Sequence, residues 1–161
     1  MESRTRWLAV VFAFVSACCF ALAMLEPWWT VGEMAIGPFG THACFGGECA
    51  ERGLTWIIGA DAMWMRSAVA VRAAGYIAMF VLLALAGALA AKRIPHLIAK
   101  LTFVALLTAG VTGSYFTFAF PGVADSSVGI GLFLFVVGIG LGVVAPITVM
   151  RSAAASPRAR R

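Results

Sequence analysis

The sequence predicts an all-α membrane protein, a four-transmembrane-helix bundle with a small antiparallel β-sheet in its first extracytoplasmic loop. The first observation is composition: 62% of the residues are hydrophobic and 12% are charged. In soluble domains about 45–50% of the residues are apolar and about 25% are charged. The second is length, because a chain of 161 residues is too short to bury so much apolar surface in a water-soluble core. The third is the distribution of apolar residues, which fall into four long stretches.

A membrane-crossing helix needs about 20 mostly apolar residues, and four segments meet this requirement: residues 7–25, 67–91, 97–120 and 127–150. A cleaved signal peptide is the alternative for the first segment. Its apolar run is longer than the usual core of about 7–15 residues, and no small-residue cleavage site follows it. We therefore expect one transmembrane domain over residues 1–151, followed by a disordered basic cytoplasmic tail over residues 152–161.

The positions of Lys and Arg predict the orientation, since these residues gather on the cytoplasmic side. With four crossings the three basic groups next to the spans fall on one side: Arg4 and Arg6, then Lys92, Arg93 and Lys100, and then Arg151, Arg158, Arg160 and Arg161. The loop over residues 26–66 then lies outside, together with most of the acidic residues. Both termini are predicted to be cytoplasmic. The Ala-, Gly- and Arg-rich composition is typical of a GC-rich bacterial genome, which indicates a bacterial inner membrane.

Glycines in the fourth span predict close helix contacts, because small residues let helices approach each other in lipid. Gly138 and Gly142 are four residues apart and share a face, to which Gly131 adds a further small residue. Two interpretations stay open for these glycines. They pack the bundle internally, or they form a face that docks another protein or a second copy. Pro146 is predicted to kink or close this helix.

The outer loop predicts a small sheet. Residues 29–36 alternate in part, and residues 54–58 are rich in branched and aromatic side chains, with a turn-rich stretch at 37–40 between them. Cys44 and Cys49 lie on the oxidising side of the membrane, where disulfides persist, so a disulfide within the connection is the favoured interpretation. The alternative is a zinc site that adds His42 and Glu48 to the two cysteines.

These features resemble the superfamily of claudins, peripheral myelin proteins and epithelial membrane proteins, which have four spans, inward termini and a long first outer loop. Trp28 or Trp29 corresponds to the first Trp of the family's loop signature. Gly37 and Phe39 stand where the family has Gly-Leu-Trp, with Pro38 between them. The resemblance implies a β-sheet on the membrane surface and a disulfide between the two loop cysteines.

The same resemblance places the family's arginine at Arg72 or Arg66, near the outer end of the second span. A charge within a span is costly unless it reaches the interface or finds a partner. Arg72 is therefore expected to reach the interface or to pair with Glu26 or Asp125. The functional alternative is contact with an anionic lipid headgroup or with a carboxylate of a partner. Trp28, Trp29 and Trp64 are predicted to form an aromatic belt at the outer interface.

Three functional hypotheses follow. The favoured one is a non-enzymatic, claudin-like protein that acts through lateral and extracytoplasmic protein contacts, as a structural or accessory subunit of a membrane assembly. No span centre carries an ionisable residue, and no metal, cofactor, nucleic acid or small-molecule substrate is expected. The partners would be membrane lipid and other subunits or copies of the chain. The alternatives are a pore-forming or transport-related oligomer, and a quinone-coupled thiol oxidoreductase that uses the loop cysteines.

Overall fold

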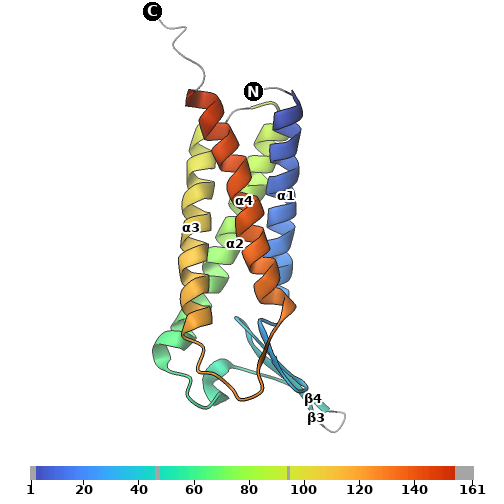
Figure 1. The fold of residues 1–161 in the computed structure, drawn as a ribbon, viewed down its shortest axis with the longest axis vertical. Coiled ribbons are helices and arrows are strands. Elements are labelled where there is room, and N and C mark those ends of the chain that lie inside the picture. Colours follow the sequence, from blue (N-terminus) through green and yellow to red (C-terminus); the bar gives the residue numbers. More distant parts are fainter. Residues whose placement is uncertain (1–2, 46–47, 94, 155–161) are drawn as a thin grey trace, which may run out of the picture.

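Four long helices stand side by side with a small sheet at one end (Figure 1). This computed structural model describes residues 3–45, 48–93 and 95–154. The helices are α1 (Ser3–Leu25), α2 (Ala62–Ala90), α3 (His96–Phe118) and α4 (Ile130–Ala154). All four are long and apolar enough to cross a membrane, which supports the predicted four-helix membrane fold. The start of α1 and the end of α4 lie together at one end of the bundle, which we call the termini end. The sheet lies at the opposite end, which we call the sheet end.

Two helix boundaries differ from the prediction for local reasons. Helix α2 begins at Ala62 rather than at residue 67, because the side chain of Asp61 caps it by accepting a 2.6 Å hydrogen bond from the backbone N–H of Trp64. Helix α4 begins at Ile130 rather than at residue 127, because residues 127–128 form a short strand.

At its other end α4 is longer than predicted. It continues through Pro146 as far as Ala154, so the proline does not close the helix. The start of the predicted disordered tail, residues 152–154, is therefore helical. The rest of that tail, residues 155–161, lies outside the described residues.

Small side chains line the contacts between helices. In α1, Ala9, Ala13 and Ala17 recur every four residues and are all buried, so they lie on one face. In α2 the buried Ala74 and Ala78 have the same spacing. Because apolar side chains gain little by leaving lipid, this close backbone approach stabilises the bundle mainly through van der Waals contact.

The sheet has five antiparallel strands in the order β4-β3-β2-β1-β5: β1 (Trp29–Val31), β2 (Met34–Gly37), β3 (Gly40–Phe45), β4 (Glu48–Arg52) and β5 (Ser127–Val128). The predicted sheet is confirmed, and residues 37–40 form the turn between β2 and β3. Gly40 has φ +139°, and a Cβ there would collide with the carbonyl oxygen of Arg52. The strand expected at residues 54–58 is wrong, since Leu54–Trp56 forms one turn of 3₁₀ helix.

An aromatic cluster joins the sheet to the helices. Trp28 is fully buried, its Nε1 donates to the carbonyl of Ala23 at 2.8 Å, and its ring lies 5.5 Å from that of Phe116. Trp64 stacks on the same Phe116 at 5.1 Å and donates to its carbonyl. Trp29 stacks on Phe120 at 4.2 Å. The predicted outer aromatic belt is therefore wrong for these three tryptophans, which form a core beneath the sheet.

Candidate interaction site at the sheet end

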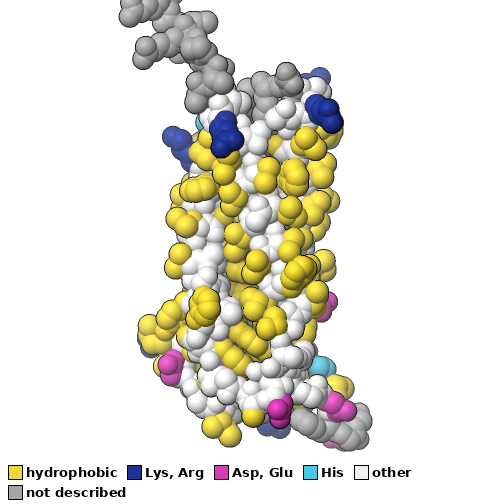
Figure 2. Space-filling model, in the orientation of Figure 1, with side chains coloured by type: hydrophobic (Ala, Val, Ile, Leu, Met, Phe, Trp, Pro, Cys, Tyr) yellow, Lys and Arg dark blue, Asp and Glu magenta, His cyan; other side chains and the backbone are white. Residues whose placement is uncertain are grey.

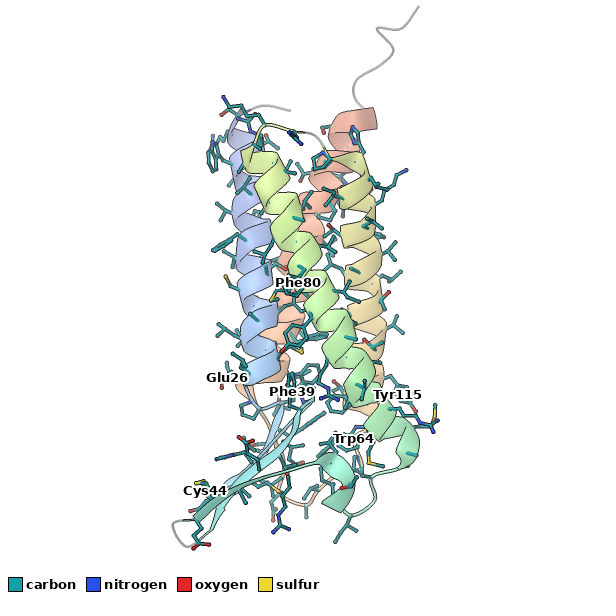
Figure 3. All side chains as sticks on the ribbon, turned by 180° about the vertical axis from the view of Figure 1, so that it is seen from behind. Glu26, Phe39, Cys44, Trp64, Phe80 and Tyr115 are labelled. Atoms are coloured by element: carbon teal, nitrogen blue, oxygen red, sulfur yellow. A yellow bond between two sulfur atoms is a disulfide. The ribbon has the colours of Figure 1, made fainter. Side chains whose placement is uncertain are left out.

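The hairpin of β3 and β4 projects away from the helices, and its tip carries the loop cysteines (Figures 1 and 3). Cys44 and Cys49 face each other across the two strands and form a disulfide, with their Cα atoms 4.0 Å apart. The predicted pairing is therefore present. The cysteines lie within the two strands rather than in the connection between them, because both strands extend further than the sequence pattern suggested.

One face of this hairpin gathers polar side chains. His42 and Cys44 are two residues apart on β3 and so share a face, and the Nε2 atom of His42 lies 3.4 Å from Cys44 Sγ. Cys49 completes the group, and the ligand atoms of the three residues all lie within 4.8 Å of one another. Glu48 is not part of it. Glu51, two residues after Cys49 and opposite His42, shares the face instead. Strand alternation carried through from Cys49 would have indicated it.

A cavity of about 220 Å³ lies beside this face, between the hairpin and the end of α1. Its lining includes Glu26, Phe39, His42, Glu51 and Arg52, so it combines acidic and basic side chains with one aromatic ring.

Strand β4 forms an open edge of the sheet. All five of its residues are exposed, and only β3 pairs with it among the described strands. The strand at the opposite edge is the two-residue β5, which pairs with β1 through Trp29 and Val128. An open edge presents unpaired backbone groups that another strand can use.

Arg72 holds the turn of the sheet against α2. Its guanidinium carbon lies 5.1 Å from the centre of the Phe39 ring, and that ring meets Tyr76 edge-on at 6.3 Å. Figure 3 shows Phe39 close to the helix ends, far from Cys44. The predicted ion pair with Glu26 or Asp125 is absent among the described residues. A cation–π contact takes its place.

The two candidate arginines of the loop signature differ in position and contacts, because Arg72 contacts Phe39. Helix α2 begins at Ala62, so Arg72 lies about 15 Å along it, whereas Arg66 is exposed near its start. The other signature residues have separate roles. Trp28 and Trp29 belong to the buried junction, and Gly37 pairs with Gly40 at the turn.

The three predicted glycines of α4 contact other parts of the chain. A Cβ at Gly131 would collide with the carbonyl oxygen of Glu26, and one at Gly138 would press on Cys19 at 3.3 Å. A Cβ at Gly142 would lie 2.6 Å from the hydroxyl of Ser16. That hydroxyl donates to the carbonyl of Gly138 at 2.6 Å. These contacts match the internal-packing interpretation.

The lateral surface is open elsewhere, in an apolar groove of about 630 Å³ between α3 and α4. Its lining is apolar apart from Ser114, and comprises Phe103, Leu106, Leu107, Gly110, Val111, Ser114, Val136, Ile139 and Val143. Sequence analysis missed this groove, because it depends on how far two neighbouring helices separate.

The charged residues divide between the two ends. In Figure 2 Lys and Arg side chains surround the termini end, Asp and Glu gather at the sheet end together with a few Lys or Arg side chains, and hydrophobic side chains cover the middle. No protein-family model matches the chain, and no curated protein is significantly similar to it. The four apolar helices define a multi-pass membrane protein with a disulfide-bonded sheet at one end.

Proposed function

We propose that this protein is a non-enzymatic, claudin-like membrane protein that works through protein contacts, as a structural or accessory subunit of a membrane assembly. The sheet end lies outside a bacterial inner membrane, and both termini are cytoplasmic. The outer contact is made by the exposed edge of β4. The observation that carries this proposal is the exposed edge of β4, which only β3 pairs among the described strands and which projects away from the bundle.

The register indicates which backbone groups are offered. The 4.0 Å Cα separation of Cys44 and Cys49 is typical of a non-hydrogen-bonded pair in an antiparallel ladder. Pairs alternate along such a ladder, so His42 and Glu51 form the next pair of this kind. The N–H and C=O groups of Cys49 and Glu51 therefore point to the open edge. A strand added there would form new hydrogen bonds without breaking the hairpin.

The charge distribution supports the orientation. Arg4, Arg6, Lys92, Arg93 and Arg151 lie at the termini end, and basic residues flank the cytoplasmic side of membrane helices. The disulfide at the opposite end fits an oxidising compartment. Two unrelated chemical preferences therefore favour the same topology.

The test compares two substitutions at one edge position. Glu51→Pro removes the N–H that faces the open edge and leaves the hairpin's own bonds in place. Glu51→Gln removes only the charge and serves as the matched control. Each form is extracted under mild conditions from its native membrane and its assembly is measured by native mass spectrometry. We expect wild type and Glu51→Gln to carry a stoichiometric partner or second copy, and Glu51→Pro to lose it.

Two results would overturn the proposal. One is a wild-type protein that is only monomeric under conditions that preserve other membrane complexes. The other is a Glu51→Pro protein that keeps its partner. Mass analysis of the Cys44–Cys49 disulfide in each variant shows whether the hairpin is still closed.

A further inference from the structure

The face of the hairpin that carries the disulfide also carries a histidine in contact with it. His42 Nε2 lies 3.4 Å from Cys44 Sγ, and the ligand atoms of His42, Cys44 and Cys49 all fall within 4.8 Å of one another. This placement follows from the register, because His42 and Cys44 are two residues apart on β3 and share a face, and Cys49 lies opposite Cys44. The two strands therefore hold three side chains of metal-binding type on one surface.

These donors suit zinc once the sulfurs are free. Zinc binds thiolate sulfur at about 2.3 Å and imidazole nitrogen at about 2.0–2.1 Å in a tetrahedral arrangement, which places neighbouring ligand atoms about 3.5 Å apart. All three ligand atoms already lie within 4.8 Å of one another, and breaking the disulfide lets the two sulfurs move apart to that spacing. The His42 and Cys49 side chains are exposed, so a hydrated ion reaches the site from solvent.

We propose that reduction of the Cys44–Cys49 disulfide creates a binding site for one Zn²⁺, with His42 Nε2 and the two cysteine sulfurs as ligands and water in the fourth position. The reductant is a dithiol, which transfers two electrons and two protons to the disulfide and becomes a disulfide itself. Zn²⁺ then displaces the two thiol protons and binds both thiolates, while neutral His42 donates its nitrogen lone pair. The negative charge of Glu51 on the same face favours the cation.

The site would preserve the shape of the hairpin in both redox states. In the oxidised protein a covalent bond joins β3 to β4, and in the reduced protein the metal joins the same two residues. The strand edge used in the proposed contact is therefore kept in register, although the metal site does not depend on that contact.

The experiment uses the full chain in lipid nanodiscs, reduced with a dithiol that is then removed, and titrated with Co²⁺ as a spectroscopic probe in place of Zn²⁺. We expect one Co²⁺ per chain with thiolate-to-cobalt charge-transfer absorption, displaced by Zn²⁺. The oxidised protein should bind at least about 100-fold more weakly. His42→Ala should weaken binding at least tenfold and retain the thiolate absorption, because both sulfurs remain.

The chain supplies its own control in Cys18 and Cys19, the two free cysteines, which lie in α1. Cys18→Ala/Cys19→Ala should bind Co²⁺ as the wild type does, whereas Cys44→Ser/Cys49→Ser should bind none. The proposal is overturned if the reduced wild type shows no thiolate absorption, if oxidised and reduced proteins bind equally, or if His42→Ala has no effect. Because His42→Ala keeps the disulfide, its fold can be checked in the oxidised form first.

Discussion

The two ends of the sheet differ in burial. Beside the helices, Trp28 is fully buried among aromatic rings and its indole N–H is satisfied. At the far end, every residue of β4 is exposed and a single disulfide closes the hairpin. One sheet therefore serves as part of the core at one end and as a presented surface at the other. The difference indicates that the residues that stabilise the fold and the residues available for contact with a partner lie at opposite ends of the strands.

The contact between Phe39 and Arg72 lies at the boundary of these regions. It holds the turn of β2 and β3 against α2, so the hairpin is fixed at its base. A surface fixed in this way is already ordered before a partner arrives, which lowers the entropic cost of binding. The contrast can be tested at the junction, at the boundary and at the tip.

The largest effect is expected at the junction. Trp28→Ala removes a fully buried indole and its hydrogen bond, which should lower the free energy of unfolding by about 3–5 kcal/mol. Trp7→Ala is the control, because Trp7 is 55% exposed at the other end of α1 and should change stability by about 0.5 kcal/mol or less. Denaturant titration in micelles measures both. Equal effects would mean that the aromatic cluster does not form the core.

A smaller effect is expected at the boundary. A double-mutant cycle with Arg72→Gln and Phe39→Leu should give a coupling free energy of about 0.5–1 kcal/mol, typical of cation–π contacts. The matched cycle pairs Phe39→Leu with Arg66→Gln, since Arg66 is exposed and closer to the start of α2. Unfolding free energies of the four proteins in each cycle provide the measurement. If only the Arg66 cycle gave a coupling free energy, the assignment of the Phe39 contact to Arg72 would be wrong.

The smallest effect on overall stability is expected at the tip. Cys44→Ser/Cys49→Ser opens a short loop, which should lower the stability of the hairpin by about 2 kcal/mol and leave the helices almost unchanged. Hydrogen exchange should quicken at the backbone amides of β3 and β4 but not in α1 or α2. Cys18→Ala/Cys19→Ala is the control. Faster exchange throughout the bundle would show that the stability of the helices depends on the disulfide at the hairpin tip.

Local signals predicted the elements that depend on few residues. Long apolar runs predict the helices, and the two loop cysteines predict the disulfide. Boundaries were less accurate where a single side chain or a distant strand decides them. Asp61 extends α2 by capping it, and β5 shortens the start of α4 by pairing with β1.

The candidate site was predicted only in part for a similar reason. Cys44, Cys49 and His42 were identified from residue type, whereas Glu48 was preferred to Glu51 because strand alternation was not extended past the cysteines. Arg72 was recognised as a charge in need of a partner, but the partner was sought among carboxylates. Its contact with Phe39 depends on how the turn folds back over α2.

The sequence alone determined that the chain forms four apolar helices with basic residues at one end, because hydrophobic run length and charge position act locally. Tertiary structure decided which tryptophans are buried, which glycines of α4 meet α1, and which strand is left at the edge. Those outcomes depend on contacts between residues far apart in the chain, as when Gly129 and Gly131 donate to the carbonyls of Trp28 and Pro27. Close packing leaves room for only one such arrangement.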